Sequence, residues 1–179
     1  MRVIAGKYRS RRLKSVAGDR TRSTKDRLKE TLFNMLGPHV VDARCLDAFA
    51  GSGALGVEAS SRGAAIVDFV ECDPVAFDVL NANIDTLGLD GASVFRKTAE
   101  AFMAATSSSY DLIFLDPPYE SDLLGRALTS IAERGLLVER GLIVALSPKT
   151  TPLHVPEVFS RIKERHVGIT TITFLEWRD

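Results

Sequence analysis

The sequence has few of the side chains that bind metal ions. Two cysteines and three histidines occur in 179 residues, and no histidine lies near a cysteine at ligand spacing. We therefore expect no metal site, and we assign the histidines no role. Cys45 and Cys72 fall within predicted strands, which favours reduced core thiols of the kind common in cytosolic proteins.

Long apolar runs are also absent. No stretch is long enough to span a bilayer, and the basic start of the chain has no apolar segment behind it that would make a signal peptide. The hydrophobic content of 45% is enough for one good core. We therefore expect a cytoplasmic protein, a monomer, with one main domain and no membrane partner.

A net charge is absent overall, since 23 basic and 23 acidic residues cancel. The distribution is uneven, because residues 1–30 contain eleven basic and three acidic residues and so carry +8, which the rest of the chain balances. Such an asymmetry is typical of a protein with a polyanion partner. A solvated basic tail would have the same composition.

The basic start of the chain also contains apolar residues between its charges: Val3, Ile4, Tyr8, Leu13 and Val16. This pattern predicts a β-hairpin arm over residues 1–20, with Gly6 near its turn and a basic face toward phosphate groups. Residues 21–179 then form the main domain. The candidate phosphate contacts are Lys7, Arg9, Arg11, Arg12, Lys14 and Arg22.

Strands and helices alternate after a helix predicted from about Ser23 to Leu36. The predicted strands are 43–49, 65–71, 92–97, 110–115 and 136–146, and the predicted helices between them are 53–62, 74–87, 98–105 and 120–134. This alternation predicts an α/β fold, a parallel sheet with helices on both faces. Two final strands, 161–167 and 169–177, have only Gly168 between them and must pair antiparallel.

A glycine turn joins the first of these strands to the helix that follows it. Its motif is Gly51-x-Gly53-x-x-Gly56, which lets the backbone approach a ligand closely and points free N–H groups toward it. The same motif is the fingerprint of dinucleotide-binding proteins. A tight strand-to-helix turn without a ligand is the alternative.

Two carboxylates lie at the ends of neighbouring predicted strands. Glu71 ends the second strand, where it faces the ligand crevice of such a sheet and can accept both ribose hydroxyls of a nucleoside cofactor. Asp73, before Pro74, fits a helix N-cap. Asp47 ends the first strand, and a buried carboxylate there needs a cation, which the ammonium of a ligand would supply.

The fourth strand runs into Asp116-Pro117-Pro118-Tyr119, the most specific signal in the sequence. The prolines fix the backbone and leave the Pro117 carbonyl as an outward acceptor. Asp116 adds a second acceptor, and Tyr119 adds a ring on which a base can stack. Two acceptors aimed at the hydrogens of an exocyclic amine favour its reactive, pyramidal form. An ordinary Pro-Pro loop is the alternative.

Asp47 to Gly53, Glu71 and residues 116–119 together resemble the class I S-adenosylmethionine-dependent amino-methyltransferases. The terminal antiparallel pair resembles the reversed last strands of that Rossmann-like fold. The opening residues 2–11 and the segment 22–34 are similar to the RsmD family, the bacterial 16S rRNA guanine-N2 methyltransferases. The sequence departs from that family at Ser23, where proline is usual, and at Thr98-Ala99, where many relatives offer Asp or Asn to adenine.

The resemblance implies a seven-stranded, mostly parallel sheet with an antiparallel C-terminal hairpin, and S-adenosylmethionine as cofactor. The substrate it implies is a guanine of 16S rRNA in the 30S subunit or an assembly intermediate. The implied catalytic residues are Asp116, Pro117 and Tyr119, of which Tyr119 also binds the RNA. The implied cofactor-binding residues are Asp47, Phe49, Ala50, Gly51, Ser52, Gly53, Glu71, Thr98, Ala99 and Asp116.

Four other functions remain as alternatives. An NAD oxidoreductase would use the glycine motif but not residues 116–119. A DNA adenine methyltransferase shares the Asp-Pro-Pro-Tyr chemistry, although the residues after Tyr119 leave no room for a target-recognition insertion. A glutamine methyltransferase of release factors uses a related loop, usually with Asn in first place. A non-catalytic RNA-binding assembly factor would explain the basic arm alone.

Overall fold

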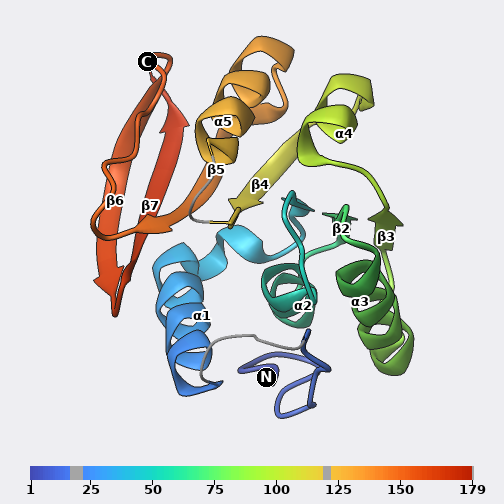
Figure 1. The fold of residues 1–179 in the computed structure, drawn as a ribbon. Helices are drawn as coiled ribbons and strands as arrows, with labels where there is room; N and C mark the ends of the chain where they lie inside the picture. Colours follow the sequence, from blue (N-terminus) through green and yellow to red (C-terminus); the bar gives the residue numbers. More distant parts are fainter. Residues whose placement is uncertain (17–21, 119–121, 179) are drawn as a thin grey trace.

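The computed structural model describes residues 1–16, 22–118 and 122–178, and within these ranges seven strands form one sheet (Figure 1). Their order across the sheet is β3-β2-β1-β4-β5-β7-β6. β1 to β5 pair in parallel, whereas β7 runs antiparallel to β5 and to β6. The predicted mostly parallel sheet with an antiparallel C-terminal pair is confirmed. The strands are β1 (Arg44–Asp47), β2 (Ile66–Val70), β3 (Ala92–Phe95), β4 (Tyr110–Leu115), β5 (Leu137–Pro148), β6 (Phe159–Val167) and β7 (Thr170–Trp177).

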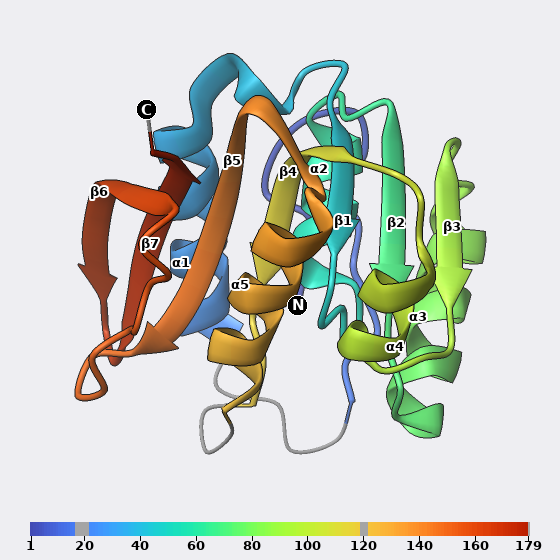
Figure 2. The ribbon, with the colours of Figure 1, turned by 90° about the horizontal axis from the view of Figure 1, so that it is seen from above.

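Helices cover both faces of the sheet (Figure 2). α1 (Arg22–Leu36), α2 (Ala54–Ser61) and α3 (Pro74–Leu87) pack on one face, and α4 (Ala99–Ala105) and α5 (Leu123–Arg134) on the other. A short 3-10 helix, η1 (Gly37–Val40), follows α1. Each face of the sheet has its own apolar core, so the central strands are buried on both sides. For this reason they lack the alternation of apolar and polar residues that is typical of a sheet with one solvent-exposed face. No helix of the described ranges is long and apolar enough to cross a membrane.

The C-terminal pair differs slightly from the prediction. β6 begins at Phe159, two residues earlier than expected, and β7 begins at Thr170. The connection is a two-residue turn, Gly168-Ile169, in which Gly168 has a φ of 60°. Glycine adopts this left-handed conformation without a steric cost, which is why the chain can reverse here so sharply.

The first sixteen residues, which we call the basic arm, form one antiparallel bridge between Arg2 and Arg12 and no longer ladder. The predicted β-hairpin of residues 1–20 is therefore not confirmed, and residues 17–20 lie outside the described ranges. The physical reason is that, although the N–H groups of Val3, Ser10 and Leu13 bond across the arm, those of residues 4, 5 and 7 bond to α2 instead. Lys7 N–H donates to the Ser61 carbonyl, and the Ile4 and Ala5 N–H groups donate to Glu58.

The two cysteines differ in burial. Cys45 is fully buried in β1, where burial raises the pKa of its thiol. Cys72 is exposed, because β2 ends at Val70 and the chain leaves the sheet before it. The expectation of two core thiols is wrong for Cys72.

Candidate active site

The glycine motif runs from the turn after β1 into α2, and its three glycines, Gly51, Gly53 and Gly56, are needed for different reasons. Gly51 and Gly53 have φ angles of 54° and 88°, which side chains disfavour. A Cβ on Gly53 would lie 2.7 Å from Leu80 of α3, and one on Gly56 would lie 2.3 Å from the ring of Phe69 in β2. A Cβ on Gly51 would meet nothing within 4 Å. Gly53 and Gly56 therefore permit close packing, while Gly51 faces open space.

Glu71 bridges the loops that follow β1 and β2. Its Oε2 accepts the Gly51 N–H at 2.8 Å, and its Oε1 accepts the Asp73 N–H at 2.7 Å. A carboxylate has about four acceptor positions, so these two bonds leave capacity for further donors. Asp73 caps α3 through Oδ1, which accepts the Ala76 N–H at 2.8 Å, and this confirms its predicted capping role.

Asp47 is a buried acid beneath the glycine turn. It is 1% exposed, and its Oδ2 accepts the Gly56 N–H at 2.8 Å. Burial raises the pKa of this carboxyl to about 7, the neighbouring Asp116 and Glu71 charges raise it as well, and the Gly56 hydrogen bond opposes them. A cation placed beside Asp47 would relieve this unfavourable environment.

The Asp-Pro-Pro segment follows β4 directly. Because Asp47 of β1 pairs with Phe114 of β4, Asp116 comes two residues beyond the register position of Asp47, at the same edge of the sheet. Asp116 and Pro118 are exposed and Pro117 is buried. The predicted stacking residue Tyr119 lies outside the described residues.

A cavity of about 140 Å³ lies beside the two prolines and was not predicted from the sequence. Besides the prolines it is lined by α5, the end of β5 and the loop after β5, including Gly125, Pro148, Leu153 and His154. Residues 149–154 contain no motif that would have predicted a cavity. They lie near Pro117 because the fold places the loop after β5 beside the end of β4. The carboxyl end of β4 is therefore followed by Asp116 and lies beside this cavity.

The remaining candidate cofactor residues surround the same edge. Ala50 and Ser52 are buried in the glycine turn, and Phe49 is partly exposed. Thr98 and Ala99 follow β3. Thr98 caps α4 through its hydroxyl, which accepts the Ala101 N–H at 3.2 Å, and Ala99 is buried. The structure thus brings the predicted residues from four loops to one side of the sheet.

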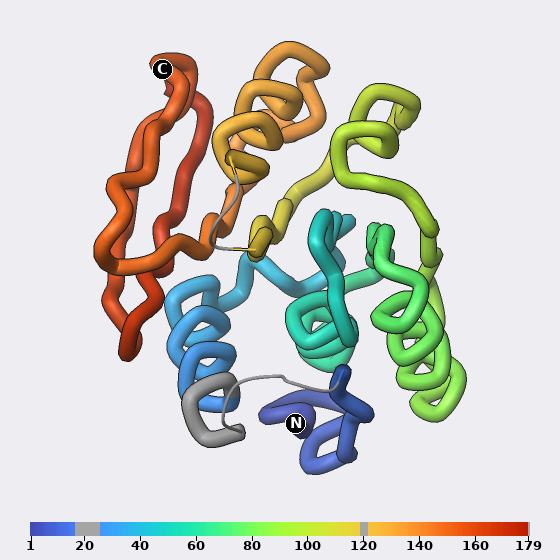
Figure 3. Tube along the Cα trace, in the orientation of Figure 1, coloured from blue at the N-terminus to red at the C-terminus, as the bar shows by residue number. Residues whose placement is uncertain are grey.

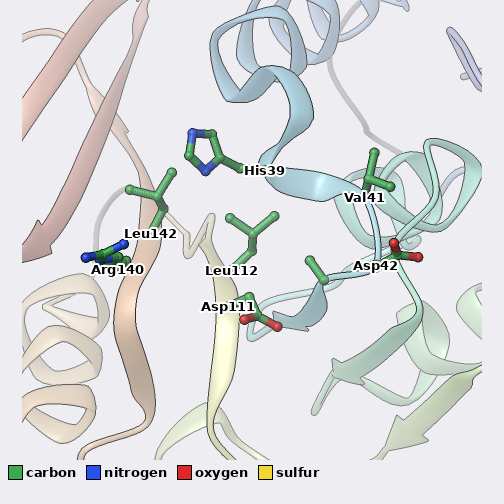
Figure 4. Close-up of a pocket in the computed structure, with 8 residues that line it drawn as sticks. His39, Val41, Asp42, Asp111, Leu112, Arg140 and Leu142 are labelled. Carbon is green, nitrogen blue, oxygen red and sulfur yellow. The ribbon is translucent and has the colours of Figure 1, made fainter.

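A second cavity, of about 180 Å³, lies at the opposite edge of the sheet, where β1, β4 and β5 begin (Figure 4). Its polar lining residues, His39, Asp42, Asp111 and Arg140, come from separate segments. Asp111 Oδ2 accepts the Arg44 N–H at 2.8 Å. In α/β sheets ligands bind outside the carboxyl ends of the strands, so this cavity is not the candidate active site.

The basic arm lies beside α2 (Figure 3), and Glu58 of that helix holds it. Glu58 is 0% exposed, and its two oxygens accept the Ile4 N–H at 2.8 Å and the Ala5 N–H at 3.0 Å. It also pairs with Lys29 at 3.3 Å and with Arg62 at 2.8 Å. Sequence reasoning missed Glu58, although it is the sole charged residue in an otherwise apolar and small-residue helix.

The basic side chains of the arm are exposed. Lys7 reaches Asp90 at 3.5 Å, and among the described residues Arg9, Arg11 and Arg12 form no ion pair. The exposed basic residues of the arm are Arg2, Lys7, Arg9, Arg11, Arg12 and Lys14, of which Arg2 pairs with Asp26 of α1 at 3.2 Å. Arg22 begins α1, but its side chain is outside the described part of the chain. The structure therefore fixes the backbone of the arm and leaves a basic outer surface.

Comparison with known proteins gives the family. A family model described as "Conserved hypothetical protein 95" matches residues 1–176. The chain is 38% identical over 175 residues to ribosomal RNA small subunit methyltransferase D of Haemophilus influenzae, covering 96% of this chain and 91% of that protein. It is 46% identical over 149 residues to the putative rRNA methyltransferase YlbH of Bacillus subtilis, covering 81% of each.

Solved structures agree with this result. The putative methyltransferase yhhF from Escherichia coli superposes with a TM-score of 0.89 at 34% identity, covering 100% of this chain and 98% of that one. The putative methylase HI0767 from Haemophilus influenzae gives a TM-score of 0.83 at 35% identity, covering 99% and 98%. The chain therefore has the class I methyltransferase fold and belongs to the conserved hypothetical protein 95 family, the RsmD family.

Proposed function

We propose that this protein transfers a methyl group from S-adenosylmethionine to the exocyclic N2 of a guanine in 16S rRNA, in the 30S subunit or an assembly intermediate. The observation that carries the proposal is the register of β1 with β4. It puts the Asp116-Pro117 acceptors at the same edge as the glycine turn and Glu71. The names of the family members, which are rRNA methyltransferases, support RNA as the substrate.

The described residues fit the cofactor. The open space at Gly51 allows a ligand to approach the backbone, and Glu71 has acceptor capacity for ribose hydroxyls. Asp47, buried and already disfavoured as an isolated anion, suits the ammonium of the methionine part. The cofactor supplies an electrophilic methyl group bound to a sulfonium.

The acceptors after β4 would hold the target amine. Asp116 and the Pro117 carbonyl accept the two N2 hydrogens, Tyr119 stacks on a base that has left its RNA context, and the adjacent cavity gives room for part of the nucleotide. Most of the rate acceleration comes from this placement. The amine becomes acidic once it is methylated, so its proton leaves to Asp116 or to water.

The basic arm would grip the phosphates of the RNA. We propose that residues 1–20 form the RNA-binding arm and residues 21–179 the methyltransferase domain, which acts as a cytoplasmic monomer without a metal. The support is the combination of a backbone fixed on α2 and exposed basic side chains. Phosphate contacts of this kind position the RNA and do not read its sequence.

The decisive experiment is transfer of labelled methyl groups to unmodified 30S particles, followed by nucleoside analysis. We expect label in N2-methylguanosine, and labelling that is about 100-fold slower or more with the Asp116→Ala variant. Three results would each contradict the proposal. They are label in N6-methyladenosine, transfer only to a release factor, and no transfer by a protein that binds both the cofactor and the particles.

A second experiment tests the arm. Replacing Arg9, Arg11 and Arg12 with Gln should weaken binding to 30S particles and flatten its salt dependence, because each phosphate contact contributes a slope of about 0.7 to 0.9 in log affinity against log salt. A control variant replaces the exposed Lys163 and Arg165 of β6. An unchanged slope for the arm variant would show that the arm is only a structural strap.

A further inference from the structure

Asn83 of α3 connects the basic arm to the glycine turn. Its side chain is almost fully buried, with 2% of the residue exposed. Its Oδ1 accepts the Lys14 N–H at 2.8 Å, and its Nδ2 donates to the Lys14 carbonyl at 3.0 Å and to the Ser52 carbonyl at 2.9 Å. One amide group thus joins the end of the arm to the centre of the candidate cofactor loop.

The bond to Ser52 fixes one peptide group of the loop. The carbonyl of the Ser52–Gly53 peptide bonds to Asn83, and its N–H, on Gly53, donates to the Ala50 carbonyl at 2.7 Å. Both polar groups of this peptide are therefore held, and its plane cannot turn without breaking one of them. This peptide lies between Gly51, which faces open space, and the left-handed Gly53.

The orientation of Asn83 depends on the arm in turn. Two of its three hydrogen bonds go to the backbone of Lys14. When the arm leaves, the Oδ1 acceptor and one of the two Nδ2 hydrogens lose their partners, and the buried amide is free to rotate toward other groups or water. The grip on Ser52 is then weakened, even though Ser52 itself does not touch the arm.

We propose that Asn83 is a positioning residue that couples docking of the basic arm to the shape of the cofactor loop. The proposal rests on the proposed function, since it assigns the loop to S-adenosylmethionine and the arm to RNA. RNA bound to the docked arm stabilises the loop that holds the cofactor. By thermodynamic reciprocity the cofactor must strengthen RNA binding by the same factor.

The coupling can be measured with S-adenosylhomocysteine, which does not react. The affinity of the protein for 30S particles is determined by filter binding with and without this compound. For the natural sequence we expect about fivefold or greater tightening, the lower end of usual coupling between sites. For Asn83→Ala we expect the two affinities to be equal within about twofold.

Asn81→Ala is the matched control. Asn81 lies on the same helix, and its Nδ2 donates to the Phe77 carbonyl of that helix at 2.9 Å, so it joins neither the arm nor the loop. The control should keep the coupling. If Asn83→Ala also keeps the coupling, Asn83 has no such role. The same follows if the natural protein binds 30S particles equally tightly with and without S-adenosylhomocysteine.

Hydrogen exchange gives a readout that does not depend on any variant folding. In the natural protein the Lys14 amide should exchange several times more slowly when S-adenosylhomocysteine is bound, because a held Ser52 carbonyl orients Asn83 toward Lys14. An unchanged Lys14 rate overturns the inference while leaving the proposed function intact. A natural protein that binds no S-adenosylhomocysteine overturns both.

Discussion

Glu58 makes the strongest prediction about stability. The pair it forms with Lys29 is buried, since the side chains are 0% and 3% exposed, and burial lowers the pKa of Lys29 despite the nearby carboxylate. Glu58→Gln keeps the shape and removes the charge. Breaking a buried ion pair in this way costs about 3 to 5 kcal/mol, because the Lys29 ammonium loses the carboxylate beside it and keeps its hydrogen bond to the Arg2 carbonyl.

A loss of that size is easy to measure. In a chain of this length each kcal/mol lowers the melting temperature by about 2 to 4 °C, so we expect a fall of about 6 to 20 °C. Urea unfolding followed by the fluorescence of Trp177 gives the free energy directly, because this is the sole tryptophan and it is partly buried in β7, away from the arm.

Two further variants make the test specific. Adding Lys29→Met to Glu58→Gln should recover part of the lost stability, because it removes the uncompensated charge. Glu133→Gln, at an exposed position of α5, should change the free energy of unfolding by no more than about 0.5 kcal/mol. If Glu58→Gln behaves like this control, the reasoning about a buried charge pair under the arm is wrong.

The remaining predictions concern the cofactor and the chemistry. Gly51→Val should abolish S-adenosylmethionine binding in calorimetry and leave the circular dichroism spectrum unchanged. Glu71→Ala should weaken binding by about 1 to 3 kcal/mol for each lost hydrogen bond; unchanged affinity in both variants would remove the cofactor assignment. Asp116→Ala should slow methyl transfer about 100-fold or more while still binding cofactor, and a normal rate would refute the acceptor role. The pKa of Asp47 is about 7 without ligand, so an ammonium bound to its ionised form should make affinity rise with pH through about 7. Calorimetry in two buffers should detect proton release that Asp47→Asn lacks, and equal release from both proteins would contradict this.

The parallel and antiparallel parts of the sheet, and the loops that form the candidate site, could be predicted because their signals are local. A glycine turn after an apolar strand and two prolines after another each specify the backbone within a few residues. The antiparallel end followed from the short connection at Gly168, which leaves no room for a crossover helix.

The docking of the arm could not be predicted in the same way. Glu58 stands out only as the single charge of α2 and Asn83 looks like an ordinary helix residue, while their partners in the arm are backbone groups, which any sequence provides. A hairpin was expected because the arm alternates apolar and basic residues. That pattern records which side chains are buried, as Val3 and Leu13 are, but not whether the backbone bonds to itself or to a helix.

The docked arm also has a consequence for synthesis of the chain. The arm is made before the residues that hold it, because Glu58, Ser61 and Asn83 follow their partners in the arm by 53 to 69 residues. At roughly 5 to 20 residues per second, the arm waits roughly 3 to 14 s before all three exist. During that time the hydrogen bonds that hold its backbone against α2 and α3 cannot all form. The arm can thus dock fully only after the chain has been made through Asn83 of α3.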